Sequence, residues 1–61
     1  MCLVKVYLSQ DENRELVCTN AASILSQNGH LVVTDFLGRS LKVSGKISEI
    51  DLNKNEVTIK T

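Results

Sequence analysis

Hydrophobic and polar side chains alternate from the start of the chain. Within residues 1–8, one face of an extended chain would carry Cys2, Val4, Val6 and Leu8. The other face would carry Leu3, Lys5 and Tyr7. A period of two is typical of a β-strand. We therefore expect a strand that begins with the first residues and has no leader in front of it.

A second alternating stretch, residues 14–19, follows a short polar turn. Its pattern predicts that Leu16 and Cys18 face inward. If this stretch returns antiparallel along the first strand, Cys18 lies opposite Val4 or Val6 and away from the start of that strand. The prediction for Cys18 is therefore a core position in the middle of a strand.

The strongest turn signal is the dipeptide Asn28–Gly29, which lies between two short apolar stretches. Both residues readily adopt positive φ, as a type I′ hairpin turn requires. Such a turn would pair Gln27 with His30, Leu25 with Val32, and Ile24 with Val33. Both faces of this hairpin are apolar, so one of them must cover the interior and the other must lie on a surface.

Three other segments carry weaker signals. Residues 19–21 are interpreted as a connector, and residues 21–25 are the one place where a helical turn competes with a strand. The turn at residues 35–40 contains the only phenylalanine of the chain, Phe36, which is predicted to plug the core.

The last third of the chain alternates again over residues 41–47. Gly45 lies in the middle of this pattern, which favours a tight bend there. At Ser48–Glu49 the alternation changes phase by one residue, which indicates a β-bulge or a corner. A polar turn at residues 51–56 then leads into a last short strand over residues 57–60.

These elements amount to five or six short strands without a convincing helix. Short strands joined by tight turns predict an all-β fold, a small antiparallel β-barrel or roll. The chain has 61 residues, which corresponds to one domain, residues 1–61. Such a chain buries only about 60% of its unfolded surface, so a metal or a partner chain would add substantially to its stability.

Composition excludes several classes of function. Seven basic and seven acidic residues give a net charge of zero, and the only aromatic residues are Tyr7 and Phe36. This argues against a nucleic-acid interface, which needs basic side chains and stacking platforms. No apolar run is long enough to span a membrane, and no signal peptide is recognisable, so we expect a cytoplasmic protein. No catalytic triad spacing or glycine-rich phosphate loop occurs, and no enzyme activity is predicted.

The candidate chemical site is at the N-terminus. The terminal amine of Met1, the amide of Cys2 and the Cys2 thiol are close enough along the chain to form adjacent chelate rings on one metal ion. Nickel(II) and copper(II) favour planar sets of nitrogen and sulfur donors. The alternative is that Cys2 is a small buried hydrophobic residue, as free cysteines often are. His30 is interpreted as a solvated turn residue.

Apolar side chains on the outward faces of two strands favour a homodimer. The predicted interface contains Leu3, Tyr7, Leu25 and Val32. The alternative is scattered exposure of single apolar side chains, which is common in monomeric proteins.

Three stretches of the chain together resemble one protein family. They are the opening Met-Cys-Leu-Val-Lys-Val, the run Val-Thr-Asp-Phe-Leu-Gly at 33–38 and the run Gly-Lys-Ile-Ser-Glu-Ile-Asp-Leu at 45–52. They are similar to CooT-type proteins, small nickel-binding accessory proteins of carbon monoxide dehydrogenase maturation that are often labelled RNA-binding. The resemblance implies a homodimeric SH3-like or Sm-like barrel. It also implies that one nickel(II) is bound at the dimer interface by the cysteine after the initiator methionine, which is Cys2 here.

The prediction from sequence is therefore a nickel metallochaperone or nickel store that binds the metal through Cys2 and the Met1 amine. Copper(II) is expected to compete in vitro. The expected partners are a second copy of the chain and a recipient nickel enzyme or maturation factor, which the resemblance does not identify. The alternative function is a small β-barrel module that binds RNA or protein without a metal.

Overall fold

The computed structural model describes residues 3–61 and contains six β-strands over that range. The strands are β1 (Val4–Gln10), β2 (Asn13–Gln27), β3 (His30–Asp35), β4 (Ser40–Ser44), β5 (Lys46–Asp51) and β6 (Glu56–Lys60). No helix occurs in this part of the chain, so none of it could cross a membrane as a helix. The predicted all-β class is confirmed.

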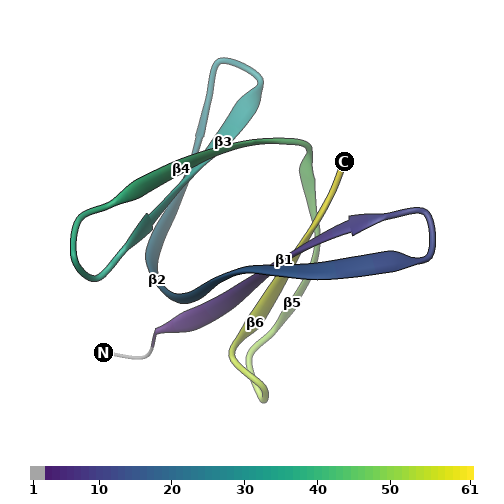
Figure 1. Ribbon diagram of the computed structural model, residues 1–61, viewed down its shortest axis with the longest axis horizontal. Coiled ribbons are helices and arrows are strands. Elements are labelled where there is room, and N and C mark those ends of the chain that lie inside the picture. Colours follow the sequence, from purple (N-terminus) through teal and green to yellow (C-terminus); the bar gives the residue numbers. More distant parts are fainter. Residues whose placement is uncertain (1–2) are drawn as a thin grey trace.

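All six strands belong to one sheet with the order β4-β3-β2-β1-β6-β5. The sheet curls on itself without closing, so the predicted barrel or roll is an open roll (Figure 1). Its two edge strands, β4 and β5, are consecutive in the chain and are joined through Gly45. Neighbouring strands are antiparallel except β1 and β6, which run parallel. After β2 the chain passes around the roll through β3, β4 and β5. It then reaches the side of β1 that β2 does not cover, where β6 runs parallel to β1.

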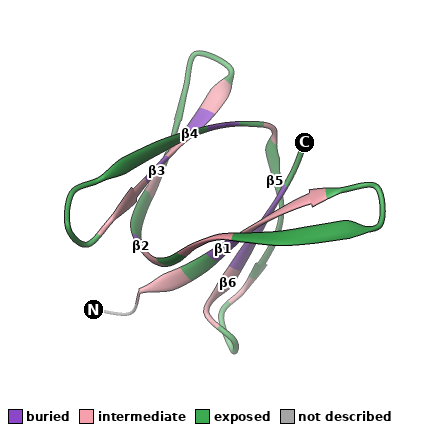
Figure 2. Cartoon of the chain, viewed as in Figure 1, coloured by how far each residue is buried: buried purple, intermediate pink, exposed green. Residues whose placement is uncertain are grey.

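The core is formed by buried side chains from five of the six strands, all except β5 (Figure 2). Its buried apolar residues are Val6, Ala21, Leu31, Val33, Val43, Val57 and Ile59. The strand registers place these side chains side by side: Val6 pairs with Val57, and Leu31 pairs with Val43. Burying one such side chain fully contributes about 1.5–3 kcal/mol, which holds the six short strands together.

The hairpin predicted at Asn28–Gly29 is confirmed. Asn28 has φ 52° and Gly29 has φ 82°, as a type I′ turn requires. Leu25 lies opposite Val32, and the pairs formed by Gln27 with His30 and Ile24 with Val33 also match the expected register.

The prediction that residues 19–21 form a connector is wrong. β2 runs without a break through this segment, and Ala21 is only 1% exposed. The helical turn considered for residues 21–25 is excluded for the same reason. Register shifts in β2 let one long strand bend around the roll, so that its first half pairs with β1 and its second half with β3.

One of these shifts also overturns the inward orientation predicted for Leu16. Val6 pairs with Cys18, but the next residue, Tyr7, pairs with Leu16. Val17 is therefore the extra residue of a bulge, and Leu16 moves to the outer face beside Tyr7, where it is 44% exposed. The prediction for Cys18 holds, since it lies opposite Val6 and packs against the core.

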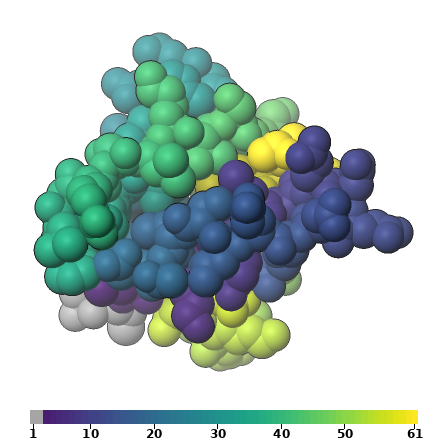
Figure 3. Space-filling view, in the orientation of Figure 1, coloured from purple at the N-terminus to yellow at the C-terminus, as the bar shows by residue number. Residues whose placement is uncertain are grey.

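Phe36 was predicted to plug the core, and this prediction is wrong because its side chain is 58% exposed. Phe36 begins the turn between β3 and β4, and its backbone N–H donates to the Asn20 carbonyl at 3.1 Å. This turn forms one edge of the molecule, opposite the projecting β1–β2 hairpin (Figure 3). Valine and isoleucine side chains from the strands fill the core in its place.

Candidate functional site

The two residues predicted to bind metal, Met1 and Cys2, lie outside the described residues. The strand that follows them is held on both sides, by β2 and by β6. Val4 pairs with Ala21, and the Lys5 backbone N–H donates to the Asn55 carbonyl at 2.9 Å. Leu3, the first described residue, is partly buried. The described part of the chain therefore begins just before a well-anchored central strand.

Cys18, the cysteine within the described residues, is a free thiol. It is partly buried, and its Sγ donates a long hydrogen bond of 3.7 Å to Asn20 Oδ1. Among residues 3–61, no group of three histidine, cysteine or carboxylate side chains is arranged to hold a metal ion. The structure thus brings Cys18 together with Asn20 and the core, as expected for a residue in mid-strand.

The residues predicted for a dimer interface lie in two places. Leu25 and Val32 face each other across β2 and β3, with Leu25 58% exposed. Tyr7 lies on β1, where the Arg14 guanidinium carbon stacks 3.7 Å from the centre of its ring. Leu3 precedes β1 and is half-buried. The part these residues play in an interface stays a prediction.

Arg14 also ties the outer face of β2 to the C-terminal strand. One of its terminal nitrogens, Nη2, lies 3.2 Å from Glu56 Oε1 and 3.2 Å from Thr58 Oγ1. Stacking on Tyr7 holds the guanidinium in place for both contacts. Arg14 thus connects β1, β2 and β6 on the outer face, and its Nη2 is already engaged by protein groups.

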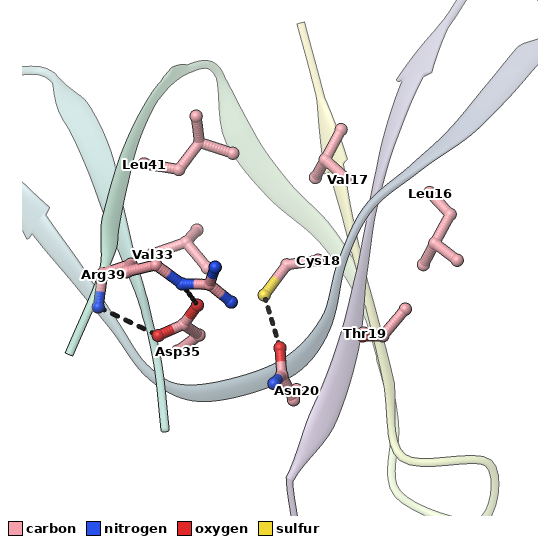
Figure 4. Close-up of a pocket in the computed structure, with 9 residues that line it drawn as sticks. All are labelled: Leu16, Val17, Cys18, Thr19, Asn20, Val33, Asp35, Arg39 and Leu41. Atoms are coloured by element: carbon pink, nitrogen blue, oxygen red, sulfur yellow. Dashed lines mark hydrogen bonds and ion pairs between the residues drawn. The ribbon is translucent and has the colours of Figure 1, made fainter. Parts of the chain in front are cut away.

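A pocket of about 420 Å³, which the sequence patterns did not predict, lies between β2 and the β3–β4 hairpin (Figure 4). Its lining residues are Val17, Cys18, Thr19, Asn20, Val33, Asp35, Arg39 and Leu41, together with Leu16, whose side chain is directed to the other side of β2 (Figure 4). Asp35 and Arg39 flank the β3–β4 turn, and this charged pair across a glycine-containing turn was the sequence signal that could have pointed to the pocket.

Asp35 organises that turn. Its Oδ1 accepts the backbone N–H groups of Leu37 at 3.0 Å and Arg39 at 2.9 Å, and its Oδ2 accepts Arg39 Nε at 2.8 Å. Burial opposes ionisation of Asp35, but these donors together outweigh it and lower the pKa of the carboxyl group below its usual value. Asp35 is therefore ionised at neutral pH and accepts three hydrogen bonds from its own turn.

Comparison with known proteins identifies the family. The family model described as CO dehydrogenase accessory protein CooT matches residues 1–60. The chain belongs to the CooT family. CooT proteins are accessory proteins and not catalysts, in agreement with the absence of enzyme motifs in the sequence.

The fold agrees with a CooT structure despite low sequence similarity. A crystal structure assigned to CooT from Carboxydothermus hydrogenoformans superposes with a TM-score of 0.88 at 14% sequence identity. The match covers 97% of this chain and 95% of that chain. No curated protein matches this CooT chain at a significant level.

Proposed function

We infer that this CooT protein is an accessory protein of carbon monoxide dehydrogenase that binds nickel(II) as cargo through Cys2 at a homodimer interface. The observation that carries the inference is the family match, which begins at residue 1 and therefore includes Cys2. A metallochaperone or nickel store for a nickel enzyme is the role that a thiolate-bearing accessory protein of this family would fulfil.

The donor chemistry at the N-terminus fits nickel(II). One chain supplies one thiolate at residue 2, with the terminal amine and an amide nitrogen beside it. A twofold axis near this residue would bring two thiolates together and repeat each contact on both chains. Nickel(II) accepts such nitrogen and sulfur donors in square-planar geometry.

The anchored start of β1 favours this arrangement. Val4 and Lys5 are bonded to neighbouring segments on either side, so the residues just before them start from a rigid strand. The described part of the chain next to the proposed site would therefore need no reordering when two chains converge on one ion. If Met1 is removed, the free amine belongs to Cys2 itself, and the donor set changes accordingly.

Isothermal titration calorimetry on tag-free protein tests the proposal. We expect one nickel(II) per dimer for the wild type and no binding for Cys2→Ser. Cys18→Ala is the matched control, because it removes the other thiol of the chain and leaves the N-terminus intact. Affinity should fall with decreasing pH, since the thiol and amine must lose their protons to bind the metal.

Tight nickel binding by Cys2→Ser would refute the proposed site. Absence of binding by the wild type, at a concentration where the protein is shown to be folded and dimeric, would instead support the alternative of a metal-free binding module. Copper(II) should compete with nickel(II) in the same experiment, because its intrinsic affinity for such donors is higher.

A further inference from the structure

The pocket between β2 and the β3–β4 hairpin has the size and composition of a small-molecule site. Its volume of about 420 Å³ falls within the range of about 300–1,000 Å³ that is usual for ligand pockets. Val33 is buried at its base, and Leu41 is partly exposed at 43% on its wall. Such sites combine apolar walls with a few convergent polar groups, and this pocket has both.

Arg39 supplies the charge at the mouth of the pocket. Its Nε is engaged by Asp35 Oδ2 at 2.8 Å, which fixes the orientation of the guanidinium. No contact within residues 3–61 occupies its terminal nitrogens, Nη1 and Nη2, and they face Cys18 across the pocket (Figure 4). The side chain is 71% exposed, so a ligand can reach it from solvent.

Asp35 leaves the terminal edge of the Arg39 guanidinium open, because it contacts Arg39 through the backbone N–H and Nε. Two backbone N–H groups donate to Oδ1, and the Arg39 Nε donates to Oδ2. The terminal edge of the guanidinium remains available, and that edge matches the two oxygens of a carboxylate as a bidentate pair.

The far wall offers polar groups of a second kind. The Cys18 thiol donates to Asn20 Oδ1, so the amide oxygen of Asn20 is turned toward the thiol (Figure 4). Cys18 itself is partly buried and presents its sulfur toward the Arg39 guanidinium (Figure 4). An anionic group between these residues would meet its donors on the Arg39 side, with the thiol close enough to report on its position (Figure 4).

We propose that this pocket binds a small organic carboxylate, whose anion is held by the terminal nitrogens of Arg39 and whose apolar body packs against Val33 and Leu41. The site is separate from the metal site inferred at Cys2, and it uses none of the same residues. Either proposal can therefore fail without affecting the other.

Alkylation of Cys18 tests the position of the anion site, because the thiol lies inside the pocket. Iodoacetate and iodoacetamide alkylate a thiol by the same step: the thiolate sulfur displaces iodide from carbon, and the thiol proton passes to solvent. Only iodoacetate carries a carboxylate. We expect the ratio of iodoacetate to iodoacetamide rates at Cys18 to be about tenfold higher in the folded protein than in the urea-unfolded chain. Peptide mapping by mass spectrometry separates Cys18 from Cys2.

Two variants isolate the guanidinium. Arg39→Gln should remove the preference for iodoacetate, while the Asp35 turn keeps its backbone hydrogen bonds from Leu37 and residue 39. Arg14→Gln is the matched control, because it removes the guanidinium that connects strands on the outer face and leaves the pocket unchanged. It should keep the preference for iodoacetate.

Direct binding is measured by NMR titration of wild-type protein with hexanoate, 1-hexanol and inorganic phosphate. Hexanoate should shift the amide signals of Asn20, Asp35 and Arg39 at concentrations about tenfold lower than the other two probes. If 1-hexanol shifts the signals as strongly as hexanoate, the negative charge plays no part in binding. If phosphate shifts them as strongly as hexanoate, the apolar wall plays no part. Either result would overturn the proposal, as would an iodoacetate preference that survives Arg39→Gln.

Discussion

Gly45 lies against the backbone of Lys60 so closely that a β-carbon on Gly45 would be 2.5 Å from the Lys60 carbonyl oxygen. The glycine has φ +142°, a conformation that other residues rarely adopt. It joins the two edge strands β4 and β5, so the roll is drawn together at the point where the chain turns from one edge to the other. This contact makes glycine a requirement of the fold at position 45.

Gly45→Ala should lower the free energy of unfolding by about 3 kcal/mol, because the added methyl group combines a strained φ with a backbone clash. Gly29→Ala is the control: Gly29 also has positive φ, but nothing lies within 4 Å of its would-be β-carbon. Its cost should be about 1 kcal/mol. Urea unfolding followed by circular dichroism measures both values, and equal destabilisation would contradict the role of the Lys60 contact.

Stability should depend on the ionisation of Asp35. Its pKa is lowered in the folded protein, so its contribution is complete above the unfolded pKa of about 3.9 and is lost as pH falls through the lower folded value. Asp35→Asn should therefore lower the thermal midpoint at pH 7, and the difference from wild type should shrink as the pH falls below 4. Asp51→Asn is the control, since Asp51 accepts only backbone N–H groups from its turn. Its effect at pH 7 should be smaller, and a difference for Asp35→Asn that persists undiminished in acid would argue against this assignment.

Cys18→Ala should destabilise the fold by about 1 kcal/mol and leave nickel binding intact. The reason is that Cys18 packs against the core opposite Val6, away from the start of β1. Chemical unfolding and calorimetry measure the two effects separately. Loss of nickel binding with unchanged stability would contradict the structural role of this residue.

Val32→Glu should convert a dimer into a monomer. Val32 pairs with Leu25 on one side and with Lys42 on the other, so a glutamate there can meet an opposite charge and the hairpin should stay folded. In a dimer interface, however, the same carboxylate would be buried against the apolar surface of the second chain. Analytical ultracentrifugation with circular dichroism checks the state of assembly and the fold. A wild type that is monomeric at high micromolar concentration would exclude the interface.

An extra residue or tag before Met1 should weaken nickel binding or change its spectrum if the terminal amine is a ligand. A tag removes the free amine and leaves the Cys2 thiol in place. Titration of tagged and cleaved protein, followed by the absorption bands of the nickel complex, makes the comparison. Identical affinity and spectra would show that the thiolates alone hold the metal.

Several features of this fold could be predicted from short stretches of sequence, because they depend on local backbone preferences. Asn28–Gly29 specified a type I′ hairpin and its register, since few residue pairs accept two positive φ values. The bend at Gly45 and the change of phase at Ser48–Glu49 were equally local, and the structure has a register shift between Ile47 and Glu49.

The tertiary structure alone decided the path of β2 and the position of Leu16. A bulge adds one residue against a partner strand, so its place depends on the curvature of the whole sheet and not on the alternation within one strand. Phe36 shows the same limit: hydrophobicity favoured burial, but the β3–β4 turn carries its side chain to the edge of the roll, where it is 58% exposed.

The sequence by itself determined the strand class and the tight turns, because each depends on residues that are neighbours in sequence. The pocket was decided only by the tertiary structure. Cys18 comes from the first half of β2, and Arg39 comes from the end of the β3–β4 turn. Only the curl of the sheet places the thiol and the guanidinium across one cavity. Alternation in the sequence predicts which face of its strand a side chain is on, but not which residues of a distant strand lie opposite that face.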